Sequence, residues 1–250
     1  MLKITHYTSY ASVVFVLFNT QYFNIWAFAL GILLITMMGS SAGLHRYFGH
    51  KCFKTSKFGH WFLGLVTTLS SQGSIAWWVD IHRVHHEYTD GPGDPIAPVN
   101  LGFWKSFFCL QDESTAFGQI RPRAVVKELR DPAVKFFHNW YWHTIILYNV
   151  LLGLIDPILI LNMYLLPVFM IRFNFGVQNT FGHGWPTLGY RNHDTEDNSR
   201  NSTLVNVLTC FLGEALHNNH HYNPSKYYYR ERWFELDPTG WIIKHVFAQK

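Results

Sequence analysis

The sequence predicts an all-α integral membrane protein, in which four transmembrane helices form two hairpins and a helical cap covers their cytoplasmic ends. Its apolar residues are concentrated in long uncharged runs, and aromatic residues make up 18% of the 250 residues. Such runs are typical of helices that cross a bilayer, and aromatic residues concentrate at its interfaces. Eight of the fifteen histidines stand in three short clusters beside these runs. We therefore expect a single domain, residues 1–250, with a metal site at the membrane surface.

The first predicted hairpin joins residues 7–18 and 23–43. The second run is about twenty residues long, enough to cross a hydrocarbon core of roughly 30 Å at about 1.5 Å per residue. The first run is short, and it spans if it thins the bilayer or extends toward the N-terminus. No small-residue cleavage site follows it, so we expect it to be retained rather than removed as a signal peptide.

The second predicted hairpin joins residues 136–155 and 157–175, which an Asp-Pro pair separates. The outer loops, residues 19–22 and 153–157, contain no Lys or Arg, whereas basic residues gather near the opposite ends of the helices. The positive-inside rule then places both termini and all the histidine clusters in the cytoplasm. The basic residues on that side are Lys3, Arg46, Lys51, Lys54, Lys57, Arg121, Arg123, Lys127 and Arg130.

Residues 58–78 are also uncharged and nearly as long as a span. A crossing there would put the second histidine cluster on the opposite side of the membrane from the first. We therefore predict that this stretch, which contains Gly, Ser and Thr, is buried against protein or lies in the interface. Residues 202–217 receive the same interpretation.

The histidine clusters have the spacing of metal ligands. Two of them have the pattern H-x-x-H-H, which places three imidazoles on one helix face, close to one metal or to two neighbouring ones. The first pair is five residues apart, and Gly49 between them lets the helix end and both rings turn to one site. Eight imidazoles exceed the ligands of one zinc ion and imply two metals, but imidazole suits zinc, copper, iron and nickel alike. The clustered residues are His45, His50, His82, His85, His86, His217, His220 and His221.

Charge and cysteine content argue against other classes of protein. The net charge of +4 comes with no block of Lys or Arg, which argues against nucleic acid as a partner. The three cysteines, Cys52, Cys109 and Cys210, are odd in number and lack C-x-x-C spacing. They indicate neither a zinc-thiolate site nor a disulfide framework, and they suit a reducing compartment.

The histidine boxes and their flanks resemble the membrane fatty acid desaturases, of the Δ9 type related to stearoyl-CoA desaturase. The likeness includes Asp80, Asp94–Pro95, Gly102–Phe103 and Gly213–Glu214, and it covers residues 44–222. It implies that the cytoplasmic cap holds a non-haem di-iron site with two iron ions as cofactors. It also implies the reaction: O2 and two electrons are used to introduce a cis double bond, at Δ9, into a saturated acyl chain.

The resemblance assigns further residues to the metals. Asn179 and His183 form an N-x-x-x-H motif after the fourth span, where the family has an asparagine that contacts one iron through water and a ninth histidine. Asp80 and Glu214 are candidates to accept hydrogen bonds from ligand imidazoles. The implied metal site is His45, His50, His82, His85, His86, His183, His217, His220 and His221, with Asn179 through water.

Six residues are candidates for the wall of the acyl tunnel. By the family's spacing, three of them fall where the tunnel bends. One of these three, Phe175, stands where the family has a threonine. The other three share a face of the second span, where related enzymes close the tunnel; helix packing explains that face equally well. The six are Gln72, Trp78 and Phe175 at the bend, and Leu33, Met37 and Ser40 on the span.

The acyl carrier and the electron donor stay open. Acyl-CoA members of the family have an Arg-Lys pair for the CoA phosphates, but residues 111–115 contain no base here. Acyl-CoA, an acyl-lipid and an acyl-carrier protein are therefore all candidate substrates. Arg121, Arg123 and Lys127 can bind phosphate, although a solvated basic patch explains them as well. We expect no fused cytochrome domain, and so a separate ferredoxin, rubredoxin or b-type cytochrome as donor on the cytoplasmic face.

Two alternatives follow from the same features. A hydroxylase on the same iron scaffold would differ only in outcome, because oxygen rebound competes with the second hydrogen abstraction. A histidine-rich metal transporter would need ionisable groups at membrane depth, whereas these histidines flank the spans.

We expect packing or interfacial roles for the histidines outside the clusters. They are His6, His60, His138, His143, His193 and His245.

Overall fold

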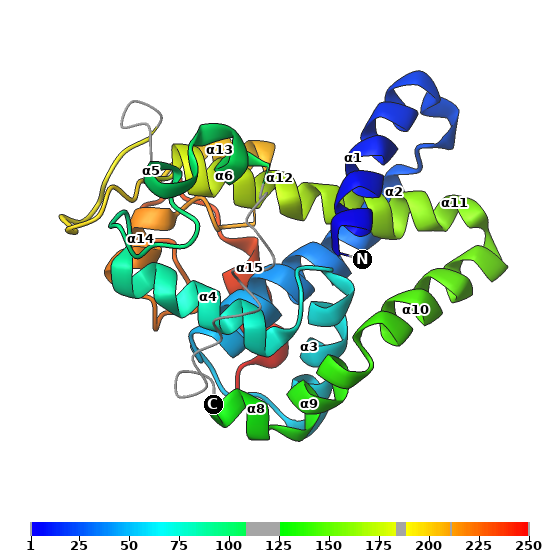
Figure 1. The fold of residues 1–250 in the computed structure, drawn as a ribbon, viewed down its shortest axis with the longest axis horizontal. Helices are drawn as coiled ribbons and strands as arrows, with labels where there is room; N and C mark the ends of the chain where they lie inside the picture. The colour runs from blue at the N-terminus through cyan, green and yellow to red at the C-terminus, as the bar shows by residue number, and fades with distance from the viewer. Residues whose placement is uncertain (1, 109–125, 184–188, 211, 250) are drawn as a thin grey trace.

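The structure is a computed structural model that describes residues 2–108, 126–183, 189–210 and 212–249. These residues form helices joined by loops, and their only extended pairings are two isolated β-bridges. The predicted all-α class is therefore confirmed. Figure 1 shows the α1, α2, α10 and α11 helices projecting to one side, while α4, α5 and α14 gather on the other.

The first hairpin ends in a helix that is longer than predicted. The helix starts at a cap, because the side chain of Asn24 accepts hydrogen bonds from the backbone of Trp26 and Ala27. It does not end at residue 43 but continues to Gly49, so it carries His45 into the cap. The elements are α1 (Leu2–Phe18), the 3-10 turn η1 (Thr20–Tyr22), α2 (Ile25–Gly31) and the π-helical η2 (Ile32–Gly49).

The second hairpin turns at the predicted Asp-Pro pair. Asp156 caps the helix that follows by accepting a hydrogen bond from the backbone of Ile158, and Pro157 occupies its first turn. The predicted span 136–155 is wrong at its start, because Trp140 separates a short helix from the apolar one. The elements are α9 (Pro132–Asn139), α10 (Tyr141–Ile155), α11 (Pro157–Ile160), η3 (Leu161–Leu165) and α12 (Leu166–Phe181).

Two continuous helical segments, Ile25–Gly49 and Pro157–Phe181, are long and apolar enough to cross a membrane. The apolar helices α1 and α10 are shorter. Exposure changes along the first of the long segments: Trp26 is exposed, whereas Ile35 is fully buried. One half of this helix therefore presents apolar side chains outward, as lipid requires, and the other half is enclosed by protein.

The remaining helices form the cap around the protein-enclosed ends of η2 and α12. Residues 58–78 are not one long helix, since residues 70–74 separate α3 from α4, and α3 packs along η2. Residues 202–217 contain a short helix and a turn. The cap elements are α3 (Lys57–Leu69), α4 (Ile75–Tyr88), α5 (Pro98–Leu101), α6 (Phe103–Phe107), α8 (Val126–Arg130), α13 (Thr203–Leu208), α14 (His217–Tyr222), α15 (Pro238–Ile242) and η5 (Ile243–Phe247).

A buried ion network joins η2 to the C-terminal part of the chain. Arg46 has 0% exposure and donates to Asp237 at 2.9 Å and to Glu214 at 2.9 Å. Its guanidinium also lies 4.0 Å from the centre of the Tyr229 ring. Arg46 therefore belongs to the interior, although it was predicted to be one of the basic residues on the cytoplasmic side of the membrane. Lys51, another of those residues, is half-exposed and pairs with Glu128 at 2.7 Å.

We predict that Gly43→Ala destabilises the contact between η2 and α3. A β-carbon on Gly43 would run into the hydroxyl of Thr67, which donates a hydrogen bond to the Gly39 carbonyl at 3.0 Å. The midpoint of thermal unfolding in detergent should fall by several degrees, as expected for a loss of about 1–3 kcal/mol from overpacking. Gly153→Ala is the matched control on α10, where a β-carbon would meet only the end of the Ile160 side chain, at 3.2 Å, which can shift, so the substitution should cost much less. Equal midpoints for both variants would refute the close packing.

Candidate metal centre

Four segments that are distant in the sequence bring their histidines to one place in the cap. η2 presents His45 near its end and His50 at its C-cap, and α12 leads directly to His183. α4 and α14 each carry an H-x-x-H-H motif. The rings meet across these segments, with 4.5 Å between the centroids of His45 and His220. The structure thus brings together the eight clustered histidines and His183.

The nine histidines form two groups rather than one. Within each group the candidate ligand atoms all lie within 4.8 Å of one another. Both α4 and α14 contribute to both groups, as three imidazoles on one helix face allow. The first group is His45, His50, His82, His86 and His220, and the second is His85, His183, His217 and His221.

The Nε2 atoms within each group converge at the distances of metal ligands. Nε2 of His82 is 2.7 Å from that of His50 and 3.2 Å from that of His86, and Nε2 of His183 is 2.8 Å from that of His217. Adjacent corners of an octahedron with metal–nitrogen bonds of about 2.1 Å are about 3.0 Å apart, against about 3.4 Å for a tetrahedron. The five and four nitrogens can thus each surround one ion, and iron is among the metals that imidazole suits.

The opposite ring nitrogens of four histidines face carboxylates. A protonated Nδ1 donates to the carboxylate, and this fixes the ring with the lone pair of Nε2 toward the metal position. The pairs are His45 with Glu214 at 2.5 Å, His85 with Asp94 at 2.8 Å, His183 with Asp90 at 3.3 Å and His221 with Asp197 at 2.9 Å.

These partners differ from the expected ones. Glu214 contacts a histidine as predicted, but the histidine is His45 and not the nearby His217. Asp80 is buried on α4, and its role stays a prediction. The only feature of the sequence that indicates a role for Asp94 is its position after the second histidine box. Asp90 and Asp197 approach from loops, and no spacing in the sequence indicates them.

Burial favours the neutral form of three imidazoles that belong to the two groups. It lowers the pKa of His82, His217 and His220 well below the usual value, and the neighbouring histidines lower it further. The neutral imidazole is the form that binds a metal. Burial opposes the charge of Glu214 as well, but attraction by the adjacent histidine and guanidinium holds the pKa of this carboxyl well below its usual range. Glu214 is therefore ionised and accepts the Nδ1 proton of His45.

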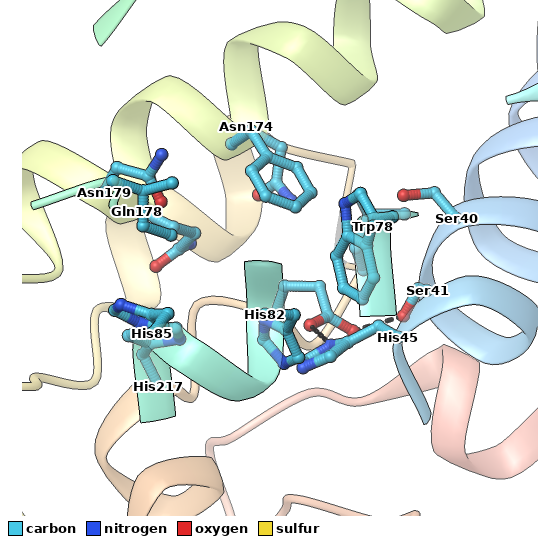
Figure 2. A pocket seen from close by; sticks show the side chains of 14 residues that line it. Ser40, Ser41, His45, Trp78, His82, His85, Asn174, Gln178, Asn179 and His217 are labelled. Carbon is cyan, nitrogen blue, oxygen red and sulfur yellow. Dashed lines mark hydrogen bonds and ion pairs between the residues drawn. The ribbon is translucent and has the colours of Figure 1, made fainter. Parts of the chain in front are cut away.

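A cavity lies against the histidines, between η2 and Trp78 on one side and α12 on the other (Figure 2). The Trp78 ring stacks on His82, with 4.5 Å between centroids, and meets Phe175 edge-on at 5.9 Å. Gln72 lies behind the wall and donates a hydrogen bond to Ser40 at 2.8 Å. The cavity therefore joins the metal positions to an aromatic surface suited to an apolar substrate.

The predicted tunnel residues divide between this cavity and its surroundings. Ser40, Trp78 and Phe175 line it, as does Asn179. Leu33 borders a separate groove beside α15, and Met37 packs on the core around Trp78. Among the described residues that line the histidine cavity, neither Leu33 nor Met37 is found. Their place at the far end of a tunnel stays a prediction.

The described residues among the others considered in the sequence belong to neither histidine group. Residues 111–115, Cys109, Arg121 and Arg123 are outside the described part of the chain. Lys127 is exposed on α8. Six histidines are in neither group: His6, His60, which contacts Asp131, His138, His143, His193, which contacts Glu231, and His245.

Comparison with known proteins identifies the class. Residues 23–249 match the family described as fatty acid desaturase, and the chain belongs to this family. The sn-1 stearoyl-lipid 9-desaturase of Synechocystis is 32% identical over 253 residues, which cover 97% of this chain and 76% of that protein. Delta-9 acyl-lipid desaturase 1 of Arabidopsis thaliana is 30% identical, over 87% of this chain and 70% of its own.

The predicted resemblance is therefore confirmed, and the chain is an oxygen-dependent fatty acid desaturase, an oxidoreductase of lipid metabolism in the membrane. Membership of this family excludes the metal transporter. Relatives also include a hex-5-enoyl-(acyl-carrier protein) acetylenase of Moorena producens, 28% identical over 83% of this chain and 69% of that protein. The family scaffold thus hosts more than one outcome on an acyl chain.

We predict that Asp94→Asn weakens metal binding without unfolding the protein. The substitution removes the charge that orients His85, and loss of such a partner typically costs about 10–100-fold in metal affinity. Titration of the metal-free protein with ferrous iron measures the change. Asp156→Asn, at the cap of α11, is the control with the same substitution and should bind iron normally. Unaltered affinity in Asp94→Asn would show that the contact does not orient the ligand.

Proposed function

We propose that this chain introduces a cis double bond at Δ9 of a saturated acyl chain, at a di-iron centre held by the nine histidines. The observation that carries the proposal is the pair of histidine groups, of five and four members, beside a cavity with aromatic walls. Bound iron would supply the oxidant, formed with O2 and two electrons, that removes two hydrogens from adjacent carbons. Asn179, in the cavity wall, would hold a water at one iron.

The side chains around the irons prepare the site. Glu214, Asp90, Asp94 and Asp197 keep the Nδ1 protons in place, so that Nε2 of each partner histidine faces a metal position. Arg46 holds Glu214 in turn. These contacts would orient the rings before the metals bind.

The cavity supports the assignment of an acyl substrate and a fixed bond position. Trp78 and Phe175 meet nearly at right angles, with 83° between their planes, and would bend an acyl chain beside the irons. A bend fixes which two carbons lie near the oxidant, because proximity and orientation decide the reacting atoms. Phe175 stands where the family has a threonine, and its phenyl ring is bulkier.

Hydroxylation or acetylene formation would use the same parts. One relative is named as an acetylenase, which supports acetylene formation as an alternative outcome. Analysis of the products by mass spectrometry separates an alkene from an alcohol or an alkyne.

We place four membrane spans in the chain, with both termini and the metal centre in the cytoplasm. The apolar segments Ile4–Phe18, Ile25–Gly49, Tyr141–Ile155 and Pro157–Phe181 support the four spans. The turns within the two hairpins contain no Lys or Arg, which supports the orientation. The one-domain arrangement follows, since η2 and α12 run from these spans into the cap.

We propose a membrane lipid as the acyl carrier. The relatives from Synechocystis and Arabidopsis thaliana are named for acyl-lipid substrates. A groove beside η2, lined by Leu33, Trp241 and Arg230 among others, supports the same carrier. Trp241 is 57% exposed, and an exposed indole beside a guanidinium suits the headgroup region of a bilayer. CoA and a carrier protein are the alternatives, and a ferredoxin, rubredoxin or b-type cytochrome would deliver electrons at the cytoplasmic face.

We predict that His85→Ala and His220→Ala, one in each histidine group, each reduce desaturation below detection. Each change removes a nitrogen ligand, while the apolar helices that hold the protein in the membrane are untouched. Fatty-acid profiles of a host expressing each variant, and the iron content of purified protein, measure the effect. His138→Ala and His143→Ala should retain both properties. A profile unchanged from wild type in either ligand variant would refute the site.

We predict that Arg230→Gln lowers desaturation of stearoyl groups on phospholipid vesicles about fivefold, because a basic residue near anionic lipid contributes about 1 kcal/mol. Lys226→Gln is the control, since Lys226 is also exposed but is paired with Glu231 at 3.1 Å. Purified protein would be assayed with distearoyl phospholipid and with stearoyl-CoA in parallel. Turnover of stearoyl-CoA alone would contradict the lipid carrier.

A further inference from the structure

Three side-chain amides on α12 point into the cavity without hydrogen-bond partners. Asn174, Gln178 and Asn179 are 5%, 7% and 5% exposed. Oδ1 of Asn174, Nε2 of Gln178 and Nδ2 of Asn179 are buried and unpaired among the described residues. Figure 2 shows the three amides above the histidines, with Gln178 and Asn179 over His85 and His217.

These amides need a polar partner that the protein does not supply. Each buried, unpaired polar group costs about 1–3 kcal/mol. A saturated acyl chain has no group that can donate or accept a hydrogen bond. The partner must therefore be a water or another polar ligand in the cavity. Gln178 and Asn179, which lie over His85 and His217, are the two amides placed beside a metal position, and the family's asparagine accounts for only one of these two.

The two histidine groups differ in their number of ligands, and Gln178 lies near the smaller group. The group with four histidines offers one nitrogen fewer than the other. It includes His85, His183 and His217, and Gln178 lies five residues before His183, which follows the end of α12. Oε1 of Gln178 lies 3.1 Å from the position that a β-carbon would take on Gly182, so the amide lies beside the turn that leads to His183. The absence of a side chain on Gly182 leaves room for this orientation.

We propose that Gln178 is a positioning residue at the four-histidine iron, beside Asn179, where its Oε1 accepts a hydrogen bond from a water on that iron and its buried Nε2 donates to a second water in the cavity. The proposal rests on the di-iron function proposed above. It gives this iron two amide partners above the histidine nitrogens, whereas the five-histidine position has a fuller set of protein nitrogens. The amide thereby replaces the interaction that the missing fifth histidine would supply.

The substitutions Gln178→Glu and Gln178→Leu separate this role from simple packing. A carboxylate near the iron keeps an oxygen acceptor and adds a negative charge, so Gln178→Glu should retain two irons. Leucine removes the acceptor, so Gln178→Leu should lower the affinity for one of the two irons about tenfold. If Gln178 only fills space, the order reverses, because burying an unpaired carboxylate is worse than burying leucine.

The measurement is an iron titration of metal-free, detergent-purified protein, with Mössbauer spectra of the loaded forms. We expect one of the two iron sites to change its spectrum in both Gln178 variants, and iron retention in the order Glu above Leu. Asn174→Leu is the matched control, since it makes the same change one helical turn further from His183 and should leave iron binding and the spectra unaltered. Unfolding midpoints would show that all variants are folded.

Three results would overturn the proposal. They are iron retention in Gln178→Leu equal to or above that in Gln178→Glu, an equal loss in Asn174→Leu, and unaltered spectra in both Gln178 variants. Each of these can occur while the wild-type protein binds two irons, and then the proposed function stands without this role for Gln178. A wild-type protein that does not bind two irons would instead overturn both.

Discussion

The buried guanidinium of Arg46 is the interaction on which the rest of the site depends. It lies at the end of η2 and donates to Glu214 and Asp237, which belong to the loop before α14 and the cap of α15. A buried charge is tolerated only when its partners satisfy it, and removing one partner typically costs about 3–5 kcal/mol. The network therefore fixes three chain segments relative to one another. Through Glu214 it also sets the ring of His45, so the same charge serves the fold and the metal site.

The sequence was sufficient for the features that repeat along a helix. The H-x-x-H-H motifs place three rings on one face whatever the surroundings, and the resemblance to the desaturases indicated Asn179 and His183. Loop partners could not be predicted in this way. Asp90 and Asp197 reach their histidines only after the chain has folded, and nothing in their local sequence distinguishes them from solvated carboxylates. Glu214 illustrates both cases, because its involvement was predictable and its partner across the fold was not.

The sequence predicted that the long helices exist, but it predicted their boundaries less well. Hydropathy marks where a helix can lie in lipid, and the predicted run stopped at residue 43 as polar residues began. Those polar residues are part of the same helix, which continues through the protein-enclosed half to Gly49. For the same reason, the sequence predicts that Arg46 is a charge at the membrane interface, although Arg46 has 0% exposure. In a helix that passes from lipid into protein, polarity marks a change of surroundings and not the end of the element.

The division of α4 and α14 between the two histidine groups has a mechanical consequence. Side chains three and four residues apart on a helix are held about 5–6 Å apart at their β-carbons, so the separation of the two metal positions is set by the helical repeat rather than by loops. Neither position can be widened without rotating a helix that also serves the other. An ion at one position would therefore restrict the rotamers at its neighbour and lower the entropy that a second ion would have to overcome. Two ions held in this way would fill the pair cooperatively, with the half-filled protein as the minor species.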